Sequence, residues 1–295
     1  MAQRYEKVQS ERHFYEHFFV STNFLFKKFA HSVHSAYFCT NYKIEMKITI
    51  LQTDIQWGNP SQNADNAYEM ISRAEKSDLY VLPEMWSTGF ATNPTGMAEV
   101  DGGLSLKWMK GVAKEFDAAI CGSISIYDSH DGTYRNRHYF VYPNGEYAFY
   151  DKHHLFSYGG EDRFYKAGEE RTTVGFGEFR FLLVTCYDLR FPKWVRYEDD
   201  YDAIIVVANW PKSRQNAWQI LTRARAIENQ SFLIGCNRVG KDESCEYIGR
   251  SVVVGPKGQT IAQAHSGRQQ WITADISMES LNRLRGKFRV LDERD

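Results

Sequence analysis

Three side chains in this sequence could together carry nucleophilic chemistry: Glu84, Lys152 and Cys186. Each follows a short apolar or aromatic run and precedes a turn-forming segment. A carboxylate can accept a thiol proton, an ammonium can hold a developing oxyanion, and the thiol can then attack an acyl carbon. Taken singly, each residue also has an ordinary alternative. Glu84 would be a surface acid, Lys152 a solvated charge and Cys186 a small buried apolar side chain.

The segment around the cysteine gives the most local information. Residues 181–184, with the sequence FLLV, are apolar and indicate a buried strand. Cys186 stands in the polar turn that follows, and Pro192 suits the first turn of a helix. Backbone N–H groups of such a helix would stabilise a thiolate and later an oxyanion.

Alternating strands and helices must position these residues. The apolar runs and turn signals predict strands at 46–52, 79–82, 118–126, 134–142, 147–150, 179–185, 203–208, 232–237, 251–254, 260–264 and 271–275. Helices are predicted at 60–76, 104–116, 217–229 and 278–285, the first with Asn59 as N-cap. This alternation with inserted hairpins predicts an α/β layered domain with mixed sheets, whose strand ends gather ligands.

Composition excludes several classes of protein. The 295 residues carry a net charge of −1, which lacks the basic footprint of a nucleic-acid-binding protein. No run approaches the ~18 apolar residues of a membrane helix. The five cysteines are scattered without a C-x-x-C pair, so neither a zinc site nor a disulfide framework is indicated. We therefore expect a cytoplasmic protein with free thiols.

The first 45 residues differ from the remainder. They are rich in Phe, Tyr and His and carry charges throughout, with none of the features of a signal peptide. A clear strand begins at Met46. We interpret residues 1–45 as an upstream extension, with Met46 as the natural start and residues 46–295 as the functional domain. The alternative is an N-terminal arm that packs its aromatic side chains on that domain.

Three motifs make the chain resemble the nitrilase superfamily, the carbon–nitrogen hydrolases with a Glu–Lys–Cys triad. They are PEMWSTGF at residues 83–90, YDKHHLF at 150–156 and TCYDLRFP at 185–192, in the family's order. The resemblance covers roughly residues 46–280. It implies a four-layer α-β-β-α sandwich, no metal or organic cofactor, and a homodimer that pairs through residues 192–197 and the C-terminal stretch.

The resemblance also assigns roles. Glu84 would be the base, Cys186 the nucleophile that forms a thioester, and Lys152 an oxyanion ligand together with the Tyr187 backbone N–H. A second family glutamate matches Glu161, which would position Lys152 and the substrate; the adjacent Asp162 is the competing assignment.

Within the superfamily, the motifs look most like the ω-amidase branch. Those enzymes hydrolyse the terminal amide of short α-keto acid amides such as 2-oxoglutaramate and 2-oxosuccinamate. Arg190 would anchor the substrate carboxylate or brace the cysteine turn, and Trp210 would line the pocket or pack in the core. The substrate-binding candidates are Trp86, Phe90, Tyr158, Arg190 and Trp210.

Three rival functions remain open at this stage. The first is an amidase of the same superfamily that acts on deaminated glutathione or an N-carbamoyl amine. The second is a non-catalytic scaffold that keeps the fold, against which the intact triad argues. The third is an acyltransferase, for which the membrane segments typical of lipid-modifying relatives are lacking.

Overall fold

The computed structural model describes residues 45–293 of the chain. The expectations for residues 1–44 therefore lie outside the described residues. Within residues 45–293, no helix is both long and apolar enough to span a membrane. The described part begins directly with a strand, β1, at Glu45–Gln52.

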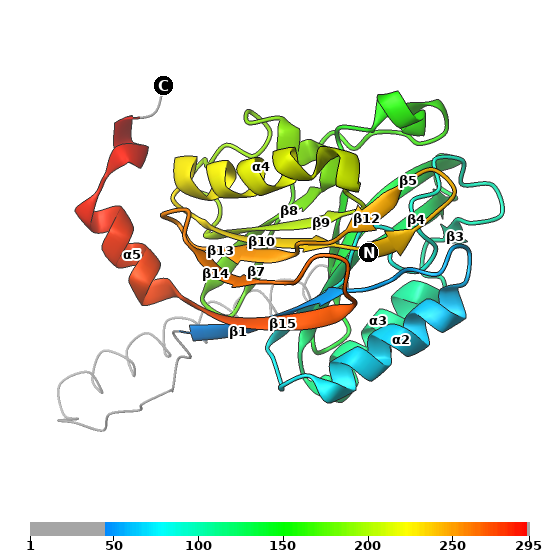
Figure 1. Ribbon diagram of the computed structural model, residues 1–295, viewed down its shortest axis with the longest axis horizontal. Helices are drawn as coiled ribbons and strands as arrows, with labels where there is room; N and C mark the ends of the chain where they lie inside the picture. The colour runs from blue at the N-terminus through cyan, green and yellow to red at the C-terminus, as the bar shows by residue number, and fades with distance from the viewer. Residues whose placement is uncertain (1–44, 294–295) are drawn as a thin grey trace, which may run out of the picture. The chain divides into compact units, whose positions relative to one another are not determined.

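One sheet is built mainly from the first half of the described chain (Figure 1). Its order is β15-β1-β2-β4-β5-β6, and β3 also pairs with β4. Helices α2 (Pro60–Arg73) and α3 (Leu104–Phe116) lie together on its outer face. The further strands are β2 (Leu79–Val81), β3 (Glu99–Val100), β4 (Ala119–Asp128), β5 (Thr133–Val141), β6 (Tyr147–Asp151) and β15 (Gln270–Ser277).

The other sheet comes from the second half and has the order β14-β13-β10-β9-β8-β7. Helix α4 (Gln215–Glu228) covers its outer face (Figure 1). The strands are β7 (Thr173–Phe176), β8 (Phe179–Thr185), β9 (Ala203–Ala208), β10 (Phe232–Asn237), β13 (Val252–Val254) and β14 (Thr260–Gln263). A separate hairpin pairs β11 (Val239–Lys241) with β12 (Glu246–Ile248).

A shared hydrophobic core holds the two sheets face to face. It joins Ile50 and Val81 of the first sheet to Leu183 and Ile205 of the second, all fully buried. Each sheet has one further apolar cluster, which lies between that sheet and the helices on its outer face. The layers are therefore α-β-β-α, as the resemblance predicts, and burial on both faces explains why β8, β9 and β10 are apolar almost throughout.

Local signals place most element ends correctly. The Asn59 side chain accepts a hydrogen bond from the Gln62 N–H, and Pro60 occupies the first turn of α2, although α2 ends at Arg73 rather than at residue 76. Helix α5 (Met278–Lys287) and the short 3₁₀ helix η5 (Val290–Glu293) close the described chain.

One local prediction is wrong. No α-helix starts at Pro192; the cysteine itself opens a 3₁₀ helix, η3 (Cys186–Arg190), which ends before the proline. Short 3₁₀ turns also occur at η1 (Ser157–Gly159), η2 (Glu161–Arg163) and η4 (Lys212–Arg214).

Candidate active site

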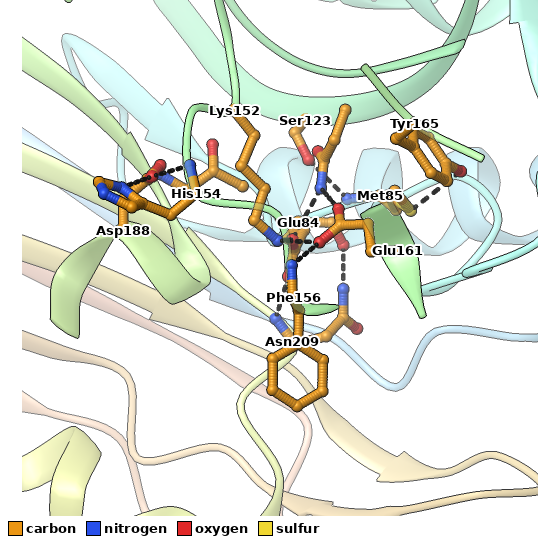
Figure 2. Close-up of polar contacts among 12 residues, drawn as sticks. Glu84, Met85, Ser123, Lys152, His154, Phe156, Glu161, Tyr165, Asp188 and Asn209 are labelled. Atoms are coloured by element: carbon orange, nitrogen blue, oxygen red, sulfur yellow. Dashed lines mark hydrogen bonds and ion pairs between the residues drawn. The ribbon is translucent and has the colours of Figure 1, made fainter. Parts of the chain in front are cut away.

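The three reactive side chains come together beyond the ends of three strands. Glu84 follows β2, Lys152 follows β6 and Cys186 follows β8. The Lys152 Nζ donates a hydrogen bond of 2.9 Å to Glu84 Oε1 (Figure 2). The Glu84 carboxylate and the Lys152 ammonium both act on the pKa of the Cys186 thiol. Because β2 and β8 belong to different sheets, the face-to-face packing of the sheets is what assembles the site.

Glu161 completes a buried ion cluster around Lys152. Its Oε2 accepts hydrogen bonds from Lys152 Nζ at 2.8 Å and from the Phe156 N–H at 2.6 Å (Figure 2). Glu84, Lys152 and Glu161 are all fully buried. Asp162, the competing assignment, is exposed, so the geometry favours Glu161 as the second glutamate.

Asn136, in β5, bridges the two carboxylates and was missed in the sequence. Its Nδ2 donates to Glu84 Oε1 at 2.8 Å and to Glu161 Oε1 at 3.0 Å. Its side chain is buried, and a buried amide must be hydrogen bonded to be tolerated. No local signal marked it, because its neighbours Arg135, Arg137 and His138 are also polar.

Asn209 holds Glu84 from the opposite sheet. Its backbone N–H donates to Glu84 Oε2 at 2.9 Å, and its Nδ2 donates to the Glu84 carbonyl at 2.6 Å. Sequence reasoning noticed this strand end but singled out the adjacent Trp210. With Asn136, Asn209 fixes both the position and the orientation of the Glu84 carboxylate.

The charges in this cluster reinforce one another. Burial disfavours an ammonium, but Glu161 and Glu84 outweigh that effect and raise the pKa of Lys152 above its ordinary value. Burial also raises the pKa of Glu161; the charge of Lys152 opposes this, and the charge of Glu84 adds to it. The two carboxylates thus favour the charged form of the Lys152 side chain between them.

The thiol of Cys186 is more basic than expected. Burial raises its pKa well above the ordinary value, and the negative charge of Glu84 adds to the rise, while Lys152 acts in the opposite direction. Lys152 thus favours the thiolate, but burial and the charge of Glu84 outweigh its effect. Chemistry at Cys186 requires a base, and the Glu84 carboxylate, whose charge acts on the thiol, can serve as that base.

The turn that presents Cys186 is held by a buried aspartate. Cys186 has a φ of 44°, a left-handed conformation that few residues other than glycine adopt. Asp188 Oδ2 accepts hydrogen bonds from the Thr185 N–H and the Tyr150 hydroxyl, and its Oδ1 accepts from the His154 N–H. Asp188 thereby ties the cysteine turn to the segment that follows Lys152 (Figure 2).

A cavity of about 490 Å³ opens at Cys186. Phe90, Tyr158, Tyr187, Arg190 and Trp210 all line it, as do Trp57, Phe156, Asn209, Arg214 and the hairpin residues 242–245. Trp210 lines the cavity and is also almost fully buried against Trp218, so it both borders the pocket and packs in the core.

Trp86 is misassigned as a pocket residue. Its side chain is buried in the core between the first sheet and its helices, and its ring lies 4.7 Å from that of Trp108. The chain turns sharply at Met85, which has a φ of 43°. The tryptophan packs on the helix side of the sheet, whereas the Glu84 side chain is hydrogen bonded to Lys152.

Comparison with known proteins agrees with this architecture. The family model described as carbon–nitrogen hydrolase matches residues 47–285. Omega-amidase YafV of Escherichia coli (strain K12) is 40% identical over 253 residues, which cover 85% of this chain and 97% of the relative. The 2-oxoglutaramate amidase of Bacillus subtilis (strain 168) is 33% identical over 253 residues, with coverage of 83% and 96%.

A solved structure is similar over the same extent. XC1258 of Xanthomonas campestris, a CN-hydrolase superfamily protein, superposes with a TM-score of 0.81 at 34% identity, covering 85% of this chain and 97% of that one. The family match spans the strands, the ion cluster and the cysteine turn. The chain therefore belongs to the carbon–nitrogen hydrolase family.

Proposed function

We propose that this protein is an amidohydrolase that releases ammonia from the terminal amide of short α-keto acid amides, with Cys186 as the nucleophile. The observation that carries the proposal is the thiol at the cavity wall, near enough to the Glu84 carboxylate and the Lys152 ammonium for both charges to act on it. The similarity of this chain to an ω-amidase and to a 2-oxoglutaramate amidase supports the same substrate class.

The first half-reaction forms a thioester. Glu84 accepts the Cys186 proton as the sulfur attacks the amide carbon, because the raised pKa of the thiol leaves little thiolate beforehand. Lys152 and the Tyr187 backbone N–H stabilise the oxyanion. The C–N bond then breaks, Glu84 returns the proton to the leaving nitrogen, and ammonia departs.

The second half-reaction releases the acid. Water enters beside the thioester, and Glu84 takes its proton as the oxygen attacks the acyl carbon. The same two oxyanion donors act again, because the oxyanion forms at the same atom. The C–S bond breaks, the proton passes from Glu84 to the Cys186 sulfur, and the carboxylic acid leaves.

The choice of substrate is tested by measuring ammonia release. We expect a higher kcat/KM for 2-oxoglutaramate or 2-oxosuccinamate than for deaminated glutathione or an N-carbamoyl amine. A preference for either of the latter would assign the protein to another branch of the same chemistry. Cleavage of none of these amides would favour the scaffold alternative.

The nucleophile is tested by trapping the intermediate. Mass spectrometry after rapid acid quench should find the acyl group of 2-oxoglutaramate on the peptide that contains Cys186. The Cys186→Ala variant should bind substrate but release no ammonia. Cys245→Ala, which changes another cavity thiol, is the matched control and should keep activity.

We also propose that residues 46–295 form the hydrolase domain, that the protein acts in the cytoplasm, and that it forms at least a homodimer through residues 192–197 and the C-terminal stretch. Residues 193–195 are a turn rather than the expected helix, so the contact would be made by a loop. Light scattering that found only monomer would contradict the dimer.

A further inference from the structure

Two arginines share the cavity with the thiol. Arg190 ends η3, and Arg214 ends η4, immediately before α4. Both line the cavity that contains Cys186, and both are partly exposed to it. The sequence singled out only Arg190, so the second cation is a feature that the fold alone brings to this cavity.

Neither guanidinium has an anionic partner. Among residues 45–293, no carboxylate lies within ion-pair distance of Arg190 or Arg214, and neither side chain donates a hydrogen bond. Arg137, by contrast, contacts three aspartates at 2.7–2.9 Å. Two guanidinium groups with unused N–H donors in one cavity are therefore available to a ligand.

Aromatic rings hold both arginines in place. The Arg190 guanidinium lies 4.9 Å from the centroid of the Trp210 ring, and the Arg214 guanidinium lies 5.0 Å from that of Phe156. A ring beneath a guanidinium contacts its flat face and leaves the N–H edge free to bind an anion. Trp210 Nε1 also donates to the Arg214 carbonyl at 2.8 Å, so Trp210 supports both residues.

The two arginines are fixed relative to the catalytic cluster. Trp210 follows Asn209 directly, and the Asn209 N–H donates to the Glu84 carboxylate. The acids of the hairpin do not neutralise the arginines. Asp242 is occupied by the Tyr247 hydroxyl and by the N–H groups of Ser244 and Cys245, and Glu243 is exposed and forms no ion pair within the described residues.

We propose that Arg190 and Arg214 together bind the α-keto carboxylate end of the substrate, while Cys186 attacks the amide at its other end. This inference rests on the proposed function and adds Arg214 to its binding site. A guanidinium fork suits a carboxylate, and an α-keto acid presents a carboxylate and an adjacent carbonyl, which gives each arginine an acceptor.

The test compares two amides that differ only at the charged end. 2-Oxoglutaramate carries the carboxylate, and 4-oxopentanamide has a methyl group in its place. Arg214→Gln should lower kcat/KM for 2-oxoglutaramate roughly 10- to 100-fold, mainly through KM, as expected for one lost charge-assisted interaction. Its kcat/KM for 4-oxopentanamide should not change. Arg190→Gln should behave in the same way, and Arg214→Lys should be intermediate.

Arg223→Gln is the matched control, because Arg223 lies on α4 beyond Arg214 and is exposed, and within residues 45–293 its side chain hydrogen bonds to Thr260 alone. It should affect neither substrate. An equal loss on both amides in the Arg214 variants, or a wild-type protein that cleaves both amides equally well, would overturn the two-arginine site. Failure of the wild-type protein to release ammonia from either amide would instead refute the proposed function.

Discussion

Removing the Asn136 amide should weaken the catalytic cluster without touching the nucleophile. In Asn136→Ala, Glu84 Oε1 and Glu161 Oε1 each lose a hydrogen bond, of 2.8 and 3.0 Å. Hydrogen bonds to charged groups contribute roughly 1.5–3 kcal/mol each. Both carboxylates keep Lys152 as a donor, so we take the lower end, which gives about 3 kcal/mol for the two bonds.

This loss has two separate consequences. If the lost free energy of about 3 kcal/mol comes from the alignment of Glu84 in the transition state, kcat should drop by roughly two orders of magnitude, since 1.4 kcal/mol is a factor of ten. The Asn136 hydrogen bond also counteracts the rise in the pKa of Glu161, so its removal should raise that pKa further. A protonated Glu161 no longer pairs with Lys152, and activity should then be lost at a higher pH than in the wild-type protein.

The assay is ammonia release from 2-oxoglutaramate across pH 5–9, together with urea unfolding of the same samples. Asn144→Ala is the control, because Asn144 is a surface turn residue whose side chain, among the described residues, hydrogen bonds to Glu146 alone. Wild-type kcat and an unshifted acid limb in a folded Asn136→Ala protein would refute the argument that this amide positions the two acids.

Three further outcomes follow from the same contacts. Lys152→Met leaves two buried carboxylates without their cation and should lower the free energy of unfolding, measured in urea at pH 8, by about 3–5 kcal/mol. Without Lys152 the pKa of Glu161 rises further, so Glu161 is more protonated at pH 5 and the loss of stability should be smaller there. An equal loss at both pH values would contradict this reasoning. Glu84→Gln should abolish ammonia release. It should also shift the pH at which iodoacetamide alkylates Cys186 to a lower value, because Glu84 raises the pKa of that thiol. Peptide mass spectrometry that found no shift of this pH would count against Glu84 as a neighbour of the thiol. Trp86→Ala should lower the free energy of unfolding by about 3–5 kcal/mol and leave KM unchanged. A raised KM would instead indicate that Trp86 contributes to substrate binding.

The residues that sequence reasoning found share a simple local signal. Lys152 and Cys186 directly follow a strand and Glu84 follows one within three residues, and strand ends are where ligands gather in α/β folds. The same alternation of apolar runs and caps predicts helix Leu104–Phe116 with its observed bounds. Features that depend on a few neighbouring residues, such as an apolar strand, a helix cap or a turn, were therefore predictable from the sequence.

What the sequence did not predict depends on contacts between distant segments. Asn136 is separated from Glu84 by 52 residues and Asn209 by 125, so neither spacing indicates that both hold one carboxylate. Arg190 and Arg214 come from separate turns, and only the fold brings both to one cavity, where each contacts Trp210. The helix expected at Pro192 fails because the turn is already formed at Cys186, where Asp188 satisfies the Thr185 N–H.

The composition of the ion cluster explains why a thiol with a raised pKa can still serve as the nucleophile. Before attack the cluster holds two carboxylates, one ammonium and a neutral thiol, a total charge of −1. After attack Glu84 is protonated, and its negative charge has moved to the oxyanion beside Lys152, so the total is unchanged. Creating a new charge in a buried site is costly, whereas moving an existing one between hydrogen-bonded groups is much less so. The proton transfer from Cys186 to Glu84 is therefore coupled to carbon–sulfur bond formation.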